Sequence, residues 1–112
     1  MGVGALFAAD SDQGFAPALP GIERKTLVYG ERTLMTVFRM RKGSTLPVHS
    51  HPFEQTGYLV SGRVRLTIAG ESFEAGPGAS WCIPSDAAHG AEIAEDAVAL
   101  EVFSPVRADY LP

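Results

Sequence analysis

Short runs of β-forming residues, separated by glycine or proline at close intervals, constrain the fold of this chain more than any other feature. The runs are rich in Val, Ile, Thr, Tyr and Phe, and no stretch repeats apolar residues at a helical spacing. We therefore predict strands over residues 25–29, 33–41, 55–60, 63–68, 72–75, 80–83, 89–93 and 97–103. Short strands at this spacing are typical of an all-β sandwich or barrel.

The breaks between these runs hold residues that suit turns. Ser61-Gly62 and Ala69-Gly70 each place a glycine where a tight hairpin turn needs a positive φ. Glu95-Asp96 is expected to separate the last two strands. Before residue 22, prolines and glycines among alanines predict an irregular N-terminal arm over residues 1–21. Residues 22–112 contain no internal repeat or linker, which predicts a single domain.

Composition narrows the class of partner. The 112 residues carry a net charge of −4, and the nine basic residues are scattered, which argues against binding to nucleic acid or to an anionic membrane. Cys82 is the only cysteine, so an intrachain disulfide is excluded, and its place between Trp81 and Ile83 predicts a buried side chain. The first residues lack the basic segment of a signal peptide, and we expect a cytoplasmic protein.

The three histidines form the most informative group of polar residues. His49 and His51 are two residues apart, so on an extended segment both imidazoles point to the same face. Pro52 ends that segment, Gln55 opens the next strand, and His89 follows a turn far downstream. A lone histidine in a β protein is more often structural than a ligand. Two imidazoles on one face, however, are already part of a coordination shell.

The spacing around these histidines resembles the two motifs of the cupin family. Gly43, five residues, His49-Ser-His51, three residues, Gln55, six residues and Gly62 resemble the first motif, with Gln in place of the usual Glu. Gly78, five residues, Pro84-x-Asp86, two residues and His89 resemble the second, with Asp86 where Gly is common and Ile93 where Asn is common. Asp86 tolerates the left-handed conformation better than most residues, so the turn can survive.

This resemblance implies a cupin jelly-roll β-barrel, a double-stranded β-helix, with one divalent metal bound by His49, His51, Gln55 and His89. Three imidazoles and an amide leave the charge of the ion uncompensated, which strengthens its Lewis acidity and favours anionic ligands. Imidazole suits Zn, Ni, Fe, Co and Cu, and the amide oxygen keeps Mn possible, so the identity of the metal stays open. The neutral set favours non-redox chemistry.

The last predicted strand allows two interpretations. Its alternation by itself places Val98, Leu100 and Val102 in the core and Glu101 in solvent. However, His-Ser-His-Pro-x-Glu-Gln at 49–55 and Val-Phe-Ser-Pro-x-Arg at 102–107 resemble a subgroup of small single-domain cupins. That subgroup includes the pectin- and alginate-degradation cupins that open 4,5-unsaturated uronates to the linear keto form.

The subgroup resemblance implies three pocket residues above the metal: Glu101, Phe103 and Arg107. Glu101, where Asp is usual, would be the general acid and base, and Arg107 would clamp the carboxylate of a small carboxylated sugar. Phe103 would be a wall that excludes water.

Three classes of function stay open: a metal-dependent isomerase or lyase-like enzyme, a different small-molecule metalloenzyme such as a cupin dioxygenase, and a binder of small ligands without catalysis. Fold alone does not choose among them. The other aromatic residues in the strands, among them Tyr58, Trp81 and Phe38, are expected in the core or the barrel lining. We also expect a homodimer, because a small barrel has exposed strand edges and the N-terminal arm can cover one of a second copy.

Overall fold

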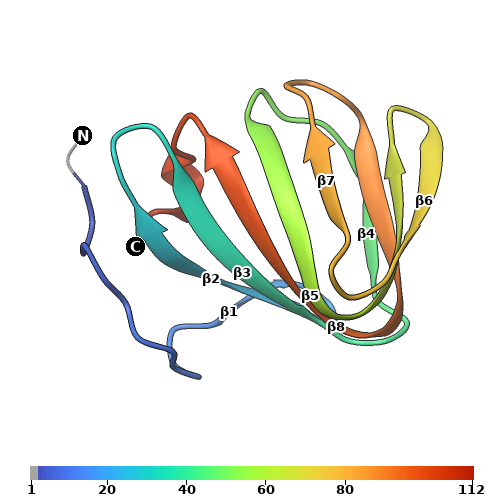
Figure 1. Ribbon diagram of the computed structural model, residues 1–112, viewed down its shortest axis with the longest axis horizontal. Coiled ribbons are helices and arrows are strands. Elements are labelled where there is room, and N and C mark those ends of the chain that lie inside the picture. Colours follow the sequence, from blue (N-terminus) through green and yellow to red (C-terminus); the bar gives the residue numbers. More distant parts are fainter. Residues whose placement is uncertain (1–2) are drawn as a thin grey trace.

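The structure is a computed structural model in which residues 3–112 are described, and it is built from antiparallel strands (Figure 1). The elements are β1 (Ala16–Leu19), β2 (Ile22–Tyr29), β3 (Leu34–Met40), β4 (Thr45–His49), β5 (Glu54–Ile68), β6 (Glu71–Ala75), β7 (Ser80–Ile83), β8 (His89–Ser104) and the short 3₁₀ helix η1 (Ala108–Tyr110). The prediction of an all-β jelly-roll barrel is confirmed.

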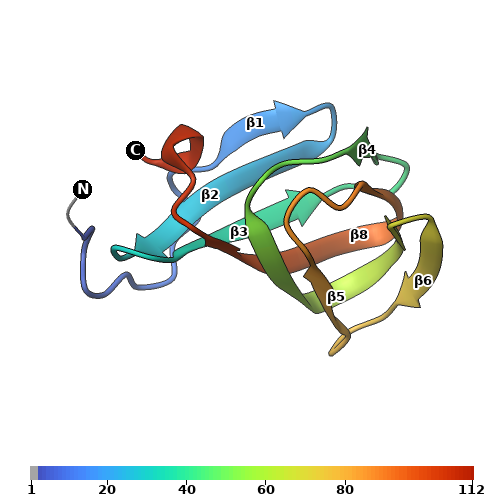
Figure 2. The ribbon, with the colours of Figure 1, turned by 90° about the horizontal axis from the view of Figure 1, so that it is seen from above.

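Two long strands, β5 and β8, connect the two sides of the barrel. They pair with each other, and β8 also pairs with β3 along one half and with β4 along the other. In the same way β5 pairs with β7 near its start and with β6 near its end. Seen from above, the strands curl around an interior, with β1, β2 and β3 on one side and β5 and β6 on the other (Figure 2).

The predicted breaks at Ser61-Gly62 and Glu95-Asp96 are wrong, because β5 and β8 continue through them. The strand pairing instead shifts register around Ser61 and Arg63, as in a β-bulge. Gly62 has a φ of 89°, and a Cβ there would overlap the backbone of Asp96 and Ala97. A glycine with positive φ serves a bulge as well as a turn, so its presence in the sequence does not distinguish the two.

The turn predicted at Ala69-Gly70 is confirmed: φ is 50° at Ala69 and 82° at Gly70, and the turn joins β5 to β6. Asp86 likewise adopts a positive φ of 66° in the turn before His89. The arm predicted over residues 1–21 is not irregular throughout, because residues 16–19 form β1 and pair with β2.

Burial along β8 shows which of its two faces lines the barrel. Ala97, Ala99, Glu101 and Phe103 are buried, whereas Val98, Leu100 and Val102 are only partly buried on the opposite face. The interpretation from alternation alone was therefore wrong. Both faces of β8 carry apolar residues, so alternation by itself does not identify the inner one.

Cys82 also differs from its prediction, since it is exposed. It has the opposite strand parity to its neighbours Trp81 and Ile83 on β7, whose side chains are turned toward the interior and more buried. Ile83 is only 2% exposed. Tyr58 on β5, expected in the core or the barrel lining, is 48% exposed for the same reason of parity.

Candidate metal centre

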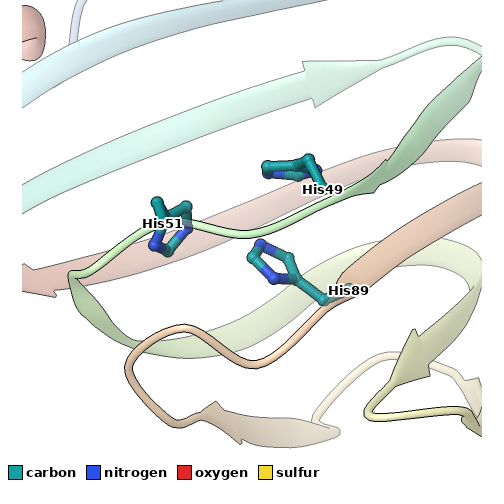
Figure 3. A group of neighbouring side chains, drawn as sticks. All are labelled: His49, His51 and His89. Atoms are coloured by element: carbon teal, nitrogen blue, oxygen red, sulfur yellow. The ribbon is translucent and has the colours of Figure 1, made fainter.

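His49, His51 and His89 converge at one end of the barrel (Figure 3). His49 ends β4 and is the cross-strand partner of His89 at the start of β8, while His51 lies in the loop before β5. One ring nitrogen from each residue lies within 4.8 Å of the others. His51 and His89 are buried and His49 is exposed, so the cluster is accessible from one side.

All three imidazoles are oriented by the same kind of backbone contact. Each Nδ1 lies 2.9–3.0 Å from a backbone carbonyl two residues away, namely His49 with Pro47, His51 with Phe53 and His89 with Ala87. Because a carbonyl oxygen only accepts, each Nδ1 carries the proton and each Nε2 keeps its lone pair. Metal-binding histidines are oriented by such contacts on the ring nitrogen that does not bind.

Burial also keeps two of these rings neutral. The pKa of His51 is lowered mainly by loss of hydration and next by the positive charge of Arg107. The pKa of His89 is lowered mainly by burial too, with smaller contributions from the neighbouring histidines and Arg107. A neutral imidazole is the form that binds a metal ion, so the environment favours the ligating state before any ion arrives.

Gln55 brings a fourth donor to the cluster. Its side chain is 8% exposed, and its Oε1 lies 3.0 Å from His51 Nε2. Its amide nitrogen donates to Glu101 Oε1 over 2.9 Å, which fixes the orientation of the amide. With His51 protonated on Nδ1, its Nε2 and the Gln55 Oε1, 3.0 Å apart, are both acceptors. A cation bound between them stabilises this arrangement. The donor set therefore fits a divalent transition metal.

Glu101 lies behind Gln55 and is 5% exposed. The Trp81 indole donates to the same carboxylate oxygen as Gln55, over 2.9 Å. Burial raises the pKa of Glu101 to about 7, while the two hydrogen bonds act in the opposite direction. Gly57 makes this contact possible, because it lies in register between Trp81 and Glu101, and a Cβ there would overlap both side chains.

A cavity of about 330 Å³ extends from this cluster into the barrel. Gln55, His89 and Glu101 supply polar groups at one part of its wall, and Arg24 and Tyr110 supply others. Most of the remaining wall is apolar, and residues of β1 form part of it. The structure thus brings three of the predicted site residues, Gln55, His89 and Glu101, together around one cavity.

Phe103 and Arg107 do not line this cavity. Phe103 is 1% exposed and packs edge-on against His51, with ring centroids 5.9 Å apart. Arg107 lies over the rings of Phe53, Phe103 and Tyr110, and its Nε and Nη2 donate to the Asp109 carboxylate over 3.2 and 2.8 Å. Arg107 is close enough to lower the pKa of His51, but two of its guanidinium nitrogens, Nε and Nη2, already donate to Asp109.

Sequence reasoning missed three residues of this region: Arg24, Trp81 and Tyr110. Trp81 was expected in the core or the barrel lining, and it does line the cavity, but its hydrogen bond to Glu101 was not predicted. Arg24 gave no such signal, because nearly every residue of β2 is half-buried and the strand shows no alternation. Tyr110 lies in η1, beyond the predicted strands.

Comparison with known proteins identifies relatives that share this architecture. A curated relative, the pectin degradation protein KdgF of Dickeya dadantii, is 29% identical over 93 residues, which cover 81% of this chain and 84% of that protein. The structure of KdgF from Halomonas sp. superimposes with a TM-score of 0.90 at 27% identity, covering 96% of this chain and 100% of that one.

A second solved structure, the RmlC-like cupin from Shewanella frigidimarina, superimposes with a TM-score of 0.93 at 23% identity and supports the fold alone. It covers 99% of this chain and 100% of that chain.

In residues 3–112, no helix is long and apolar enough to cross a membrane. The family model described as the cupin domain matches residues 36–104, a segment that contains all three histidines, Gln55 and Glu101. This chain belongs to the cupin family.

Proposed function

We propose that this protein is a metal-dependent enzyme that opens the ring of a 4,5-unsaturated uronate and yields the linear keto form. The observation that carries the proposal is the continuous contact from His51 through Gln55 to the buried carboxylate of Glu101. This contact holds the ionisable carboxyl group of Glu101 against Gln55, one of the candidate metal ligands. The likeness to KdgF proteins, one of them named for pectin degradation, supports the same class of substrate.

The proposed reaction is an isomerisation with balanced proton transfers. The proton of the anomeric hydroxyl leaves, the C1–O1 bond becomes a carbonyl, and the bond between C1 and the ring oxygen breaks. The ring oxygen then belongs to an enolate at C5, and addition of a proton at C4 converts that enolate to a ketone. One proton is removed and one is added, so no oxidant or reductant is required.

Glu101 is the residue of this chain that we assign to those proton transfers. Its pKa of about 7 makes both the acid and the carboxylate available near neutral pH. The oxygen that accepts from Gln55 and Trp81 is fixed by these contacts, and its second oxygen has no hydrogen bond among residues 3–112. In this proposal the free oxygen accepts the hydroxyl proton and later delivers a proton to C4.

The other assigned residues bind the metal ion, exclude water from the site or add positive charge to it. His49, His51, Gln55 and His89 would hold one divalent ion, and Zn, Ni, Mn, Fe, Co and Cu all suit this donor set. When bound, such an ion polarises a substrate oxygen as a Lewis acid. Phe103 excludes water behind His51, and Arg107 contributes positive charge beside the histidines. A carboxylate clamp by Arg107 first requires its ion pair with Asp109 to open.

The experiment loads the protein separately with Zn, Ni, Mn and Fe(II), and follows a 4,5-unsaturated uronate by proton NMR. We expect at least one metal form to convert the ring form faster than the His89→Ala variant. Glu101→Gln should bind metal like the wild type but lose most of the acceleration. If no metal form exceeds His89→Ala, the uronate reaction is rejected, and oxygen uptake would then test the dioxygenase class.

A further inference from the structure

Two guanidinium groups lie against the ring of Tyr110. The Arg24 guanidinium carbon is 3.8 Å from the ring centroid, and that of Arg107 is 3.9 Å from the same centroid. Both guanidinium groups therefore lie in cation–π contact with this one ring. Tyr110 itself is held in place, because the Thr26 hydroxyl donates to its backbone carbonyl.

The two arginines differ in what they contact. Arg107 donates through Nε and Nη2 to Asp109, and it does not line the cavity beside the histidines. Arg24 does line that cavity, and it is the only lysine or arginine among the described residues that does so. Within residues 3–112, Arg24 takes part in neither an ion pair nor a side-chain hydrogen bond. Its donors are therefore available to a ligand in the cavity.

The cavity has the size and the charge distribution for a small monocarboxylate. A volume of about 330 Å³ is near the lower end of ordinary ligand pockets, which suits a monosaccharide better than an oligosaccharide. Among the described residues that line it, Glu101 is the only acidic one and lies with Gln55 and His89, whereas Arg24 carries the only permanent positive charge. A planar guanidinium matches a carboxylate through two parallel hydrogen bonds, which an ammonium group does not reproduce.

We propose that Arg24 on β2 binds the substrate carboxylate inside the barrel and so selects a monomeric uronate over a neutral sugar. The inference rests on the proposed function for the identity of the sugar, but not for the charge that Arg24 recognises. Arg24 is a binding and specificity residue in this scheme, and the proton transfers stay with Glu101. Arg107 remains paired with Asp109 during binding.

The test compares Arg24→Gln, Arg24→Lys and Arg107→Gln with Arg32→Gln, which removes one exposed charge from the β2–β3 turn of the same hairpin. For the metal-loaded proteins, calorimetry or ligand-observed NMR measures the binding of D-galacturonate and of neutral D-galactose. The KM and kcat for the 4,5-unsaturated uronate are measured in parallel. Thermal unfolding of every variant shows that the compared proteins are folded.

We expect Arg24→Gln to weaken galacturonate binding and raise KM by about 10- to 100-fold, the effect of losing charge-assisted hydrogen bonds. The kcat and the affinity for galactose should change little. Arg24→Lys should recover only a small part of the lost affinity, because it restores the charge but not the two parallel N–H donors of the guanidinium. Arg32→Gln should bind galacturonate like the wild type, and Arg107→Gln should weaken binding less than Arg24→Gln does, because Arg107 contributes charge near the histidines but does not line the cavity.

Two results would overturn the inference: galacturonate affinity lost in Arg107→Gln but kept in Arg24→Gln, or no galacturonate binding to the wild type at millimolar concentration. If the uronate is converted normally by Arg24→Gln, the inference fails while the proposed function stands. If the wild type converts no uronate but binds galacturonate through Arg24, the proposed reaction fails while the carboxylate site stands.

Discussion

Gly57 lies in register between Trp81 on β7 and Glu101 on β8, and the side chains of these two neighbours form a hydrogen bond of 2.9 Å. Replacing Gly57 with alanine adds one methyl group. This Cβ would overlap the rigid Trp81 indole and the Glu101 carboxylate, which is buried and held by two hydrogen bonds. The variant therefore tests whether position 57 must be glycine to leave room for the hydrogen bond between Trp81 and Glu101.

The cost of Gly57→Ala follows from two effects. Forcing an extra methyl into a packed interior costs about 1–3 kcal/mol in free energy of unfolding. Losing a hydrogen bond to a buried carboxylate costs about 1.5–3 kcal/mol more. We expect a total loss of about 3–5 kcal/mol. At the size of this domain, that loss lowers the unfolding temperature by at least about 10 °C.

The assay is thermal unfolding followed by circular dichroism, with the fluorescence of Trp81, the only tryptophan, as a local probe. Displacement of the indole should shift its emission in the folded state. Metal affinity should fall by about 10-fold or more, because Gln55 is oriented by the same carboxylate. Gly76→Ala is the matched control: its φ is ordinary and the nearest atom to an added Cβ is 3.8 Å away.

The reasoning is refuted if Gly57→Ala unfolds within about 2 °C of Gly76→Ala and keeps the wild-type emission spectrum, since about 0.5 kcal/mol or less would then separate the two. Unchanged metal affinity in a clearly destabilised Gly57→Ala would separate the two effects. It would retain the steric argument and reject the role of Glu101 in orienting Gln55.

Three further outcomes are expected. Metal at 100 times its Kd should raise the free energy of unfolding of the wild type by about 2.7 kcal/mol. His89→Ala should lose most of this gain, and an equal gain in both proteins, measured by thermal unfolding, would reject His89 as a ligand. Thr36 is fully buried and its hydroxyl has no hydrogen-bond partner in residues 3–112, so Thr36→Val should stabilise the fold by about 1 kcal/mol in urea titrations. A loss of similar size would indicate a bonded hydroxyl. The homodimer stays a prediction, supported by exposed Tyr58 and Val60 on β5, and light scattering should give about twice the chain mass of 11.9 kDa, whereas a monomer contradicts it.

Local signals in the sequence were sufficient for part of the fold. The β-rich runs identified the class, and Ala69-Gly70 identified a hairpin turn, because both depend on residues that are neighbours in the chain. The spacing of His49, His51 and His89 indicated a shared site, since the family resemblance supplied the long-range connection. The structure brings these rings together as the motifs imply.

Other features depend on contacts between distant strands. Gly62 and the Glu95-Asp96 pair read as breaks, yet β5 and β8 continue through them because the extra residue is absorbed as a bulge against the partner strand. The inner face of β8 is a similar case. Alanines at 97 and 99 face the barrel, whereas the larger valines and leucine lie on the opposite face, and this orientation is set by the pairing of β8 with β3 and β5.

Residue spacing and the family resemblance were sufficient to predict an all-β cupin whose three histidines share one site. The folded barrel was needed to show that Trp81 bonds to Glu101, that Arg107 is already paired with Asp109, and that Arg24 lines the cavity. The difference lies in the range of the interactions. Turn chemistry and residue spacing act between neighbours in the chain, whereas the partner of a buried charge is set by which strands the closed barrel places side by side.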